Sequence, residues 1–475
     1  MKKRTVVVAL VFALFVSLFS ACSSDDSNGG SSASPATGTQ SQTPSPGEKT
    51  AEPGEKVVIK YANWNLGTEA DNNIERQMIA AFEEAYPHID IQLDESFDYS
   101  KYGDSLAAAA AAGNLPDVMM LPNIPFGLSN EWLLNIDSYT ADDAEWASLP
   151  KVLEQAAHYG NGTYAIPAGM FFMGYFINQD LFEQANLPEL DFSPTWDDFM
   201  NAVKTLNNAQ ENILGLSEAI QIPDWYAASV NPRLGWYTWD GQQYNLNDPA
   251  YIDGVNKAKQ MLQGKYTFDS LTEEEKAKYN AGWHGEVWNQ GKVAVRWEGT
   301  WATREFGSLS FESKFIGTPG GRFALVGDFM GIAQSSAHPA EAYQFAKFMT
   351  FGQDGILKRM ELNTDGSYTS LPLTTDPGIL EQYFATNNYE GLREAFDNID
   401  QAIVEGVKIV PGYVRSRWEA PTGVKAGDKD NANLGDLIHH SVHGQTKIED
   451  YAEQINKLAN EEYKAAAAAI SAMAE

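Results

Sequence analysis

The chain has 475 residues, with 64 Asp and Glu against 33 Lys and Arg, which gives a formal net charge of -31. A chain this acidic is repelled by nucleic acid and by anionic membranes or wall polymers, so nucleic-acid binding is excluded. Roughly 420 residues follow a polar N-terminal stretch, which is more than one hydrophobic core usually organises. We therefore expect two lobes.

The N-terminus has the pattern of a secretion signal. Basic residues 2–4 precede an apolar run over 6–19 that is too short for an ordinary membrane-spanning helix, and small residues 20–21 follow. The next residue, Cys22, is the only cysteine in the chain. The stretch that ends at Cys22 resembles the lipobox of bacterial lipoproteins, so we expect a signal peptide over 1–21 and a lipid on Cys22. A plain secretory signal with an incidental cysteine is the alternative.

Residues 22–55 consist largely of Ser, Gly, Pro, Thr and Gln. Such a composition buries too little apolar surface to offset the entropy cost of ordering the chain. We expect a flexible tether that links the lipid anchor to the globular region.

The globular region alternates between two hydrophobic periods, one typical of strands and one typical of helices. The alternation predicts strands over 57–62, 89–93, 117–121 and 292–297, and helices over 74–82, 106–112, 196–206, 340–351 and 448–474. Strands that alternate with helices form mostly parallel sheets covered by helices on both faces. The predicted fold class is therefore α/β.

An ordered set of segments gives the region a family resemblance. The set comprises the Trp64-Asn65 loop after the first strand, residues 115–118, 164–167, 175–181, 291–301 and 340–350. In this order the segments resemble the extracellular solute-binding proteins of family 1, which are the receptors of carbohydrate ABC importers. The resemblance extends from about residue 57 to the C-terminus.

The resemblance implies a two-lobed periplasmic-binding-protein-like (type II) fold, in which each lobe is a mostly parallel sheet flanked by helices. The chain would cross between lobes near residues 167–174, 297–300 and 327–331. Lobe 1 would then comprise 56–167 and 300–326, and lobe 2 would comprise 168–299 and 327–475. Two permease subunits in the membrane would recognise the closed, ligand-bound monomer, and the resemblance implies no cofactor.

A sugar needs aromatic platforms for its faces and polar side chains for its hydroxyls. Trp64 and Asn65 follow the first strand, at the end where open α/β sheets place ligands. Trp301 lies on a loop at the second crossover, with packing on the next helix as the alternative. Glu298 is a candidate for hydroxyls or for a structural pair with Arg296.

The remaining candidates lie at the other crossovers and in two loops. Asp328 at the third crossover has few sequence neighbours that could neutralise it, and Phe171 at the first could wall the cleft. Trp225, Trp236 and Trp239 suggest stacking subsites, with a hydrophobic mini-core as the competing interpretation. Arg415 and Trp418 could clamp a ring or form a surface cation-π pair.

An enzyme, a metal receptor and an adhesin are the alternative function classes. A glycoside hydrolase also combines aromatics with carboxylates, but the chain lacks a nucleophile elbow, a P-loop and a zinc-protease motif, so we expect no enzyme. His439 and His443 share a helical face and could bind a metal, although a third ligand cannot be placed and no metal is predicted. A surface adhesin without a transporter would show the same anchor and tether.

Overall fold

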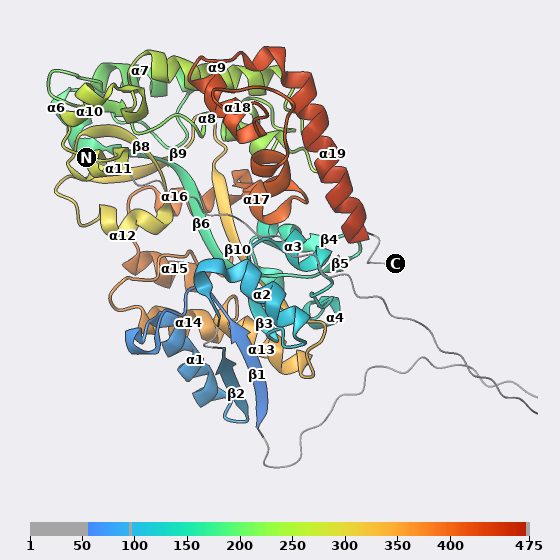
Figure 1. The fold of residues 1–475 in the computed structure, drawn as a ribbon. Helices are drawn as coiled ribbons and strands as arrows, with labels where there is room; N and C mark the ends of the chain where they lie inside the picture. The colour runs from blue at the N-terminus through green and yellow to red at the C-terminus, as the bar shows by residue number, and fades with distance from the viewer. Residues whose placement is uncertain (1–55, 95–96, 472–475) are drawn as a thin grey trace, which may run out of the picture. The chain divides into compact units, whose positions relative to one another are not determined.

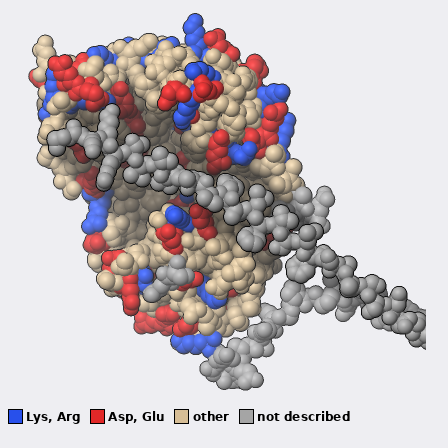
Figure 2. Space-filling model, viewed as in Figure 1, with Lys and Arg blue, Asp and Glu red and all other residues tan. Residues whose placement is uncertain are grey.

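The computed structural model describes residues 56–94 and 97–471. The predicted signal peptide, the lipid-bearing Cys22 and the tether lie outside the described residues. None of the described helices is both long and apolar enough to cross a membrane. Lys and Arg are interspersed with Asp and Glu over the face shown in Figure 2.

Within the described residues, one mixed sheet of nine strands organises the fold, in the order β2-β1-β3-β10-β6-β8-β7, with β11 beside β10 and β9 beside β6. Its strands are β1 (Val57–Ala62), β2 (Ile89–Leu93), β3 (Val118–Leu121), β6 (Ile166–Asn178), β7 (Leu214–Leu216), β8 (Val293–Gly299), β9 (Ser313–Gly317), β10 (Ala324–Ile332) and β11 (Ile403–Val404). A separate hairpin pairs β4 (His158–Tyr159) with β5 (Gly162–Thr163). The predicted α/β class is confirmed.

Strand direction changes across the sheet. Pairing is parallel at the two ends, where β1 joins β2 and β3 and where β7 joins β8. It is antiparallel in the middle, where β10 joins β3 and β6, and where β6 joins β8 and β9. The two parallel ends therefore share the central strands β6 and β10, which cross the middle of Figure 1.

The helices pack on both faces of this sheet (Figure 1). They are α1 (Ile74–Ala85), α2 (Tyr102–Ala111), α3 (Ile124–Ser129), α4 (Asp137–Thr140), α5 (Lys151–Ala156), α6 (Gln179–Gln184), α7 (Trp196–Leu206), α8 (Ile222–Val230), α9 (Pro249–Gln263), α10 (Glu273–Ala277), α11 (His284–Asn289), α12 (Thr303–Phe306), α13 (Pro339–Met349), α14 (Gln353–Leu362), α15 (Pro377–Thr386), α16 (Leu392–Asp397), α17 (Gly406–Ile409), α18 (Leu434–Val442) and α19 (Ala452–Ser471).

Strand β6 is buried on both faces along much of its length. Alternate side chains of a strand point to opposite faces, so Phe172 and Phe176 enter one hydrophobic core while Tyr175 and Ile177 enter the other. All four side chains are fully buried. Strand β6 therefore contributes side chains to both hydrophobic cores.

The C-terminal region differs from the single helix predicted over 448–474. A short 3-10 helix covers Ile448–Asp450, and α19 begins only at Ala452. Both Ile448 and Ala452 are buried. A continuous α-helix would also place these two side chains on one face, because they are four residues apart, so their burial alone does not account for the break.

Helices α13 and α14 pack at the β1 end of the sheet. The Phe345 ring of α13 lies 4.9 Å from Tyr61 of β1 and 5.0 Å from Phe82 of α1, centroid to centroid. Strand β10 runs antiparallel to β3, so it returns the chain to this end. This packing differs from the predicted assignment of 327–475 to lobe 2. Likewise β9, predicted in lobe 1, pairs with the far end of β6.

Candidate ligand-binding site

Polar and aromatic side chains gather where the parallel strands end. Trp64 follows β1, Glu298 stands next to last in β8, and Glu405 follows β11. The crossing strands add Phe171 of β6 and Asp328 of β10. The carboxyl ends of parallel strands are the usual ligand-binding edge of open α/β sheets. Four of these five residues were predicted as candidates.

Trp301 forms an exposed aromatic platform. Its side chain is 41% exposed, and its ring covers Gly299 so closely that a Cβ there would lie 2.4 Å from the ring. The indole Nε1 donates to Glu298 Oε1 at 3.0 Å, and the ring centroid lies 5.7 Å from that of Phe171. The indole is therefore fixed before any ligand arrives, which is what a stacking surface requires.

Glu298 forms the structural pair with Arg296 that the sequence analysis kept as one of two alternatives. Its Oε2 pairs with Arg296 Nη2 at 2.6 Å, while its Oε1 accepts from the Trp301 indole and from the Gly299 N–H. Arg296 is only 4% exposed, and its Nε and Nη1 have no hydrogen-bond partner among the described residues. The Glu298–Arg296 pair therefore orients the Trp301 indole, and the Nε and Nη1 donors of Arg296 stay without a partner beside it in the described part of the chain.

Trp283 is a second platform that the sequence analysis missed. It is 48% exposed, and a Cβ on Gly285 would lie 2.2 Å from its ring. The Arg296 guanidinium lies 5.3 Å from its ring centroid, so Arg296 joins Trp283 to Glu298. The sequence did contain a signal for this residue. Trp283 lies directly before a short helix and ten residues before β8, and loops that precede such helices meet at the ligand-binding edge.

A carboxyl and an imidazole lie beside this arginine. His284 Nε2 is 3.5 Å from Glu218 Oε2, and Glu218 follows β7 shortly after its carboxyl end. Burial raises the pKa of Glu218, with Gln221 opposing the rise. Burial, and next Arg296, lower the pKa of His284. The histidine is therefore neutral at pH 7 and can donate a hydrogen bond without adding charge.

Asp328 has a partner that its sequence neighbourhood did not reveal. Lys408 Nζ lies 2.9 Å from Asp328 Oδ1, and the same ammonium is 5.3 Å from the Trp64 ring centroid. A Cβ on Gly169 would touch both Asp328 and Phe171. The charge of Asp328 is therefore paired, and the pair connects Trp64 to the crossing strands, whereas a ligand-facing role for Asp328 stays a prediction.

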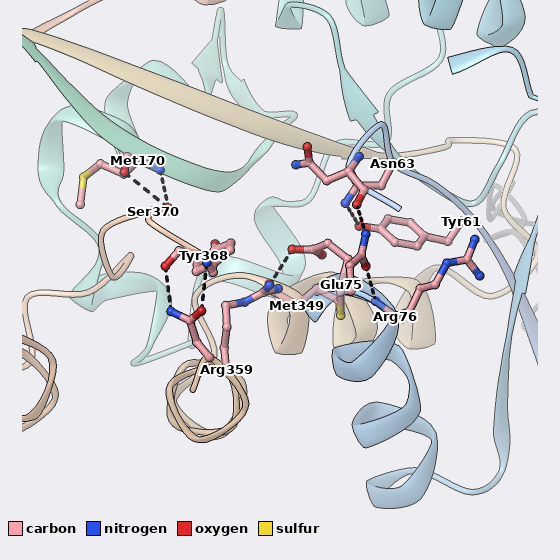
Figure 3. Close-up of polar contacts among 12 residues, drawn as sticks. Tyr61, Asn63, Glu75, Arg76, Met170, Met349, Arg359, Tyr368 and Ser370 are labelled. Atoms are coloured by element: carbon pink, nitrogen blue, oxygen red, sulfur yellow. Dashed lines mark hydrogen bonds and ion pairs between the residues drawn. The ribbon is translucent and has the colours of Figure 1, made fainter. Parts of the chain in front are cut away.

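A layer of buried polar contacts supports the Trp64 loop. Asn63 Oδ1 accepts from the Asn65 N–H at 2.8 Å, and Asn63 Nδ2 donates to Tyr61 at 2.7 Å. Below it, Figure 3 shows Glu75 of α1 pointing toward Arg359 of α14, with 2.6 Å between the nearest charged atoms. The exposed Asn65 thus stands on a rigid base.

The segment 363–373 supports the Trp301 side of the site. Ser370 Oγ accepts from the Met170 N–H at 3.0 Å, and Thr369 Oγ1 donates to the Trp301 carbonyl at 3.4 Å. A pocket of about 340 Å³ lies between this segment, α14 and α15. None of the predicted site residues lines it, so the candidate site lies elsewhere.

The tryptophan cluster is placed in the interior. Trp225 is fully buried, Trp236 is 4% exposed, and the half-buried Trp239 packs on Tyr463 of α19 at 4.5 Å between centroids. These contacts are those of the hydrophobic mini-core that the sequence analysis kept as the competing interpretation. Among the described residues, the ring in contact with Trp301 is that of Phe171 and none of these indoles.

Arg415 and Trp418 are not partners of each other. Arg415 pairs with Glu462 of α19 at 2.7 Å, whereas the guanidinium near the exposed Trp418 ring is that of Arg417, at 5.5 Å. Residues 415–419 form a π-helix, whose wider turn separates side chains differently from an α-helix. The predicted clamp would have to use Arg417, which is already paired with Asp224.

Fold and site together define a mixed α/β protein with exposed indoles and oriented carboxyls at the ends of its strands. Residues 67–351 match the family model of bacterial extracellular solute-binding proteins. The match spans more than half of the chain, so the protein belongs to this family. A comparison with curated proteins found no match.

Solved structures share the fold at low sequence identity. An ABC substrate-binding protein from Listeria monocytogenes in complex with cycloalternan has a TM-score of 0.65 at 17% identity, over 86% of this chain and 99% of that chain. A cyclo/maltodextrin-binding protein complexed with maltotetraose has 0.64 at 14%, over 86% and 98%. The GacH receptor of Streptomyces glaucescens, solved unliganded and with acarbose, has 0.60 at 16%, over 86% and 99%.

Proposed function

We propose that the protein is the substrate-binding receptor of an ABC importer and that it captures an oligosaccharide. The observation that carries the proposal is the Trp301 platform, which is exposed, covers Gly299 and is held by Glu298. An indole face stacks on the CH face of a sugar ring, and neighbouring carboxylates accept its hydroxyls. Cycloalternan, maltotetraose and acarbose, the ligands of the similar solved structures, support a saccharide as the cargo.

Capture works through differential binding. The side chains at the strand ends come from both parallel ends of the sheet, and these ends share β6 and β10. A ligand that touches both ends binds the closed arrangement better than the open one, so it shifts the population toward closure. Two permease subunits would then recognise the closed receptor.

Retention at the cell surface is part of the same proposal. A lipid on Cys22 and the tether over 22–55 would hold a monomeric receptor on the outer face of the membrane, most simply in a Gram-positive bacterium. The acidic chain is repelled by an anionic membrane, so the lipid supplies the attachment.

The test is a thermal-shift screen of residues 22–475, with Cys22→Ser, against maltotetraose, cycloalternan and acarbose. A saccharide at about 100 times its Kd should add about 2.7 kcal/mol to the free energy of unfolding. Divalent metals and product analysis belong in the screen, because a response to metal alone or hydrolysis of a sugar would favour the metal-receptor or glycoside-hydrolase alternative.

A further inference from the structure

Glu405 is a half-buried carboxyl at the carboxyl end of β11, where the chain turns into α17. Its backbone N–H donates to the Leu325 carbonyl of β10 at 2.9 Å, which attaches the residue to the central sheet. Within the described part of the chain, its side chain accepts no hydrogen bond and joins no ion pair. Its oxygens are not among the fully enclosed polar atoms that lack a partner, so solvent and a ligand can reach them.

Two ion pairs flank this carboxyl and leave it without a counter-ion. Lys408 pairs with Asp328 at 2.9 Å, and Arg417 binds Asp224 through two hydrogen bonds of 2.6 and 3.0 Å. The charged and titratable groups that face Glu405 are Lys408 of α17, Asp328 of β10, Asp224 of α8, and Arg417 and Tyr413 of the 412–419 region. Three carboxylates therefore share two cations.

The electrostatic consequence is a carboxyl that titrates near neutrality. Burial is the largest cause and raises the pKa of Glu405 to about 7. Lys408 and Arg417 oppose the rise, whereas Asp224 and Asp328 add to it. The unpaired group is thus ready to accept a donor that the free protein does not supply.

The position of Glu405 connects it to the saccharide site. Lys408, three residues on, lies over the Trp64 ring, and its partner Asp328 lies beside Gly169 on β6. A ligand on Trp64 would meet Lys408 and Asp328 already occupied with each other. Glu405 is then the nearby carboxyl whose acceptor capacity is unused.

We propose that Glu405 contacts the ligand directly and accepts hydrogen bonds from its hydroxyl or protonated amine groups. This inference rests on the proposed function. It specifies the ligand class further, because an ionised carboxylate can only accept hydrogen bonds and repels another anion. The saccharide is therefore neutral or basic at this end, and an acidic sugar is excluded there.

Binding of donors favours the ionised carboxylate, so capture depends on pH. Below the pKa of the free protein, the carboxyl must lose its proton before it accepts the ligand's donors, which weakens the apparent affinity. With a pKa of about 7, the affinity falls about tenfold from pH 8 to pH 6. Glu405→Gln removes the titration and keeps the shape of the side chain.

The experiment measures Kd by calorimetry at pH 8 and pH 6 for maltotetraose, cycloalternan and acarbose, with wild type, Glu405→Gln and Glu419→Gln. Glu419 is an exposed glutamate two residues after Arg417, so its variant is the matched control. We expect a tenfold weakening at pH 6 for wild type and for the control. Glu405→Gln should bind about tenfold more weakly than wild type at pH 8 and change less than twofold with pH.

A measurement without ligand accompanies it. The folded-state pKa of Glu405 is raised above its ordinary value of 4.5, so native wild type loses stability as pH rises from about 4.5 to 7. The Tm of Glu405→Gln relative to wild type should therefore be higher at pH 8 than at pH 5. Equal differences at the two pH values would overturn the inference.

The outcomes separate the two proposals. If wild type binds a saccharide and Glu405→Gln binds it equally well at both pH values, this inference is overturned and the receptor function stands. If wild type binds none of the three saccharides at either pH, the proposed function fails, and the inference fails with it.

Discussion

Two glycines decide how the indoles of the site are held. The rings of Trp301 and Trp283 occupy the space that a side chain on Gly299 or Gly285 would need. Neither glycine has a positive φ, so their role here is close approach and not backbone conformation. At the residue scale, each exposed indole depends on two residues: the tryptophan provides the ring, and the glycine leaves the space that the ring occupies.

Trp301→Ala should weaken saccharide binding at least fivefold, because a lost stacking aromatic costs about 1 kcal/mol or more. Trp301→Phe is the matched control, since it keeps a ring and should recover part of the loss. Because the indole is 41% exposed, both variants should unfold within about 5 °C of wild type. Calorimetry on the first saccharide found by the screen checks the affinity, and an unchanged Kd for Trp301→Ala would remove the platform role.

Gly299→Ala should reduce affinity although it deletes no ligand-contacting atom. The added methyl would lie 2.4 Å from the Trp301 ring, so the ring has to move. Gly103→Ala, in a helix with nothing nearer than 3.9 Å, is the control and should bind as wild type does. Titration of both variants with the same saccharide decides the matter, and equal affinities would mean that the ring position is unimportant.

At the element scale, buried ion pairs connect segments that are far apart in the sequence. Glu75 of α1 and Arg359 of α14 are both less than 10% exposed and join helices 284 positions apart. The Arg359 guanidinium also lies 4.4 Å from the Tyr368 ring centroid and donates to the Met349 carbonyl. This pair secures α14 behind the Trp64 loop.

Arg359→Met should lower the free energy of unfolding by about 3–5 kcal/mol, because it leaves Glu75 charged and buried without a partner. The double variant Glu75→Met/Arg359→Met should recover most of the loss, since no buried charge is left. Arg393→Met breaks an exposed pair with Asp397 and should cost about 1 kcal/mol or less. Urea unfolding measures all three, and a double variant as unstable as the single one would contradict the argument.

Separation along the chain decides which of these features could be predicted from the sequence. Hydrophobic period is local, so the strand over 57–62 and the helix over 196–206 were predicted with their observed bounds. Trp301 and Glu298 were predicted together because they adjoin one strand end. Lys408, 80 positions from Asp328, could not be predicted, because the pair exists only through the path of the folded chain. The ligand-binding roles themselves stay predictions.

At the scale of the whole molecule, α19 reaches both hydrophobic cores. Ile455 and Ala459 near its start are buried in the core that contains Tyr175, whereas Ile470 near its end packs against the core that contains Phe172. Figure 1 shows α19 running along one side of the fold toward α3. The helix therefore joins the regions that the shared strands also join.

Ile470→Asp should detach the end of α19 from this second core, because it places a charge where an apolar side chain packs. Ala469→Asp adds the same charge one residue earlier on an exposed position and is the control. Hydrogen exchange should show faster opening of the last two turns of α19 in Ile470→Asp alone. Equal exchange in the two variants would show that the contact contributes little.

The exposed indoles that pack over glycines also provide an intrinsic fluorescence signal. The chain has 12 tryptophans, and among the described residues only Trp283, Trp301 and Trp418 have more than 40% of their surface exposed. A water-soluble fluorescence quencher reaches exposed indoles far more readily than buried ones. A cargo stacked on Trp301 would screen that ring from the quencher, so occupancy can be read from the purified receptor without a label.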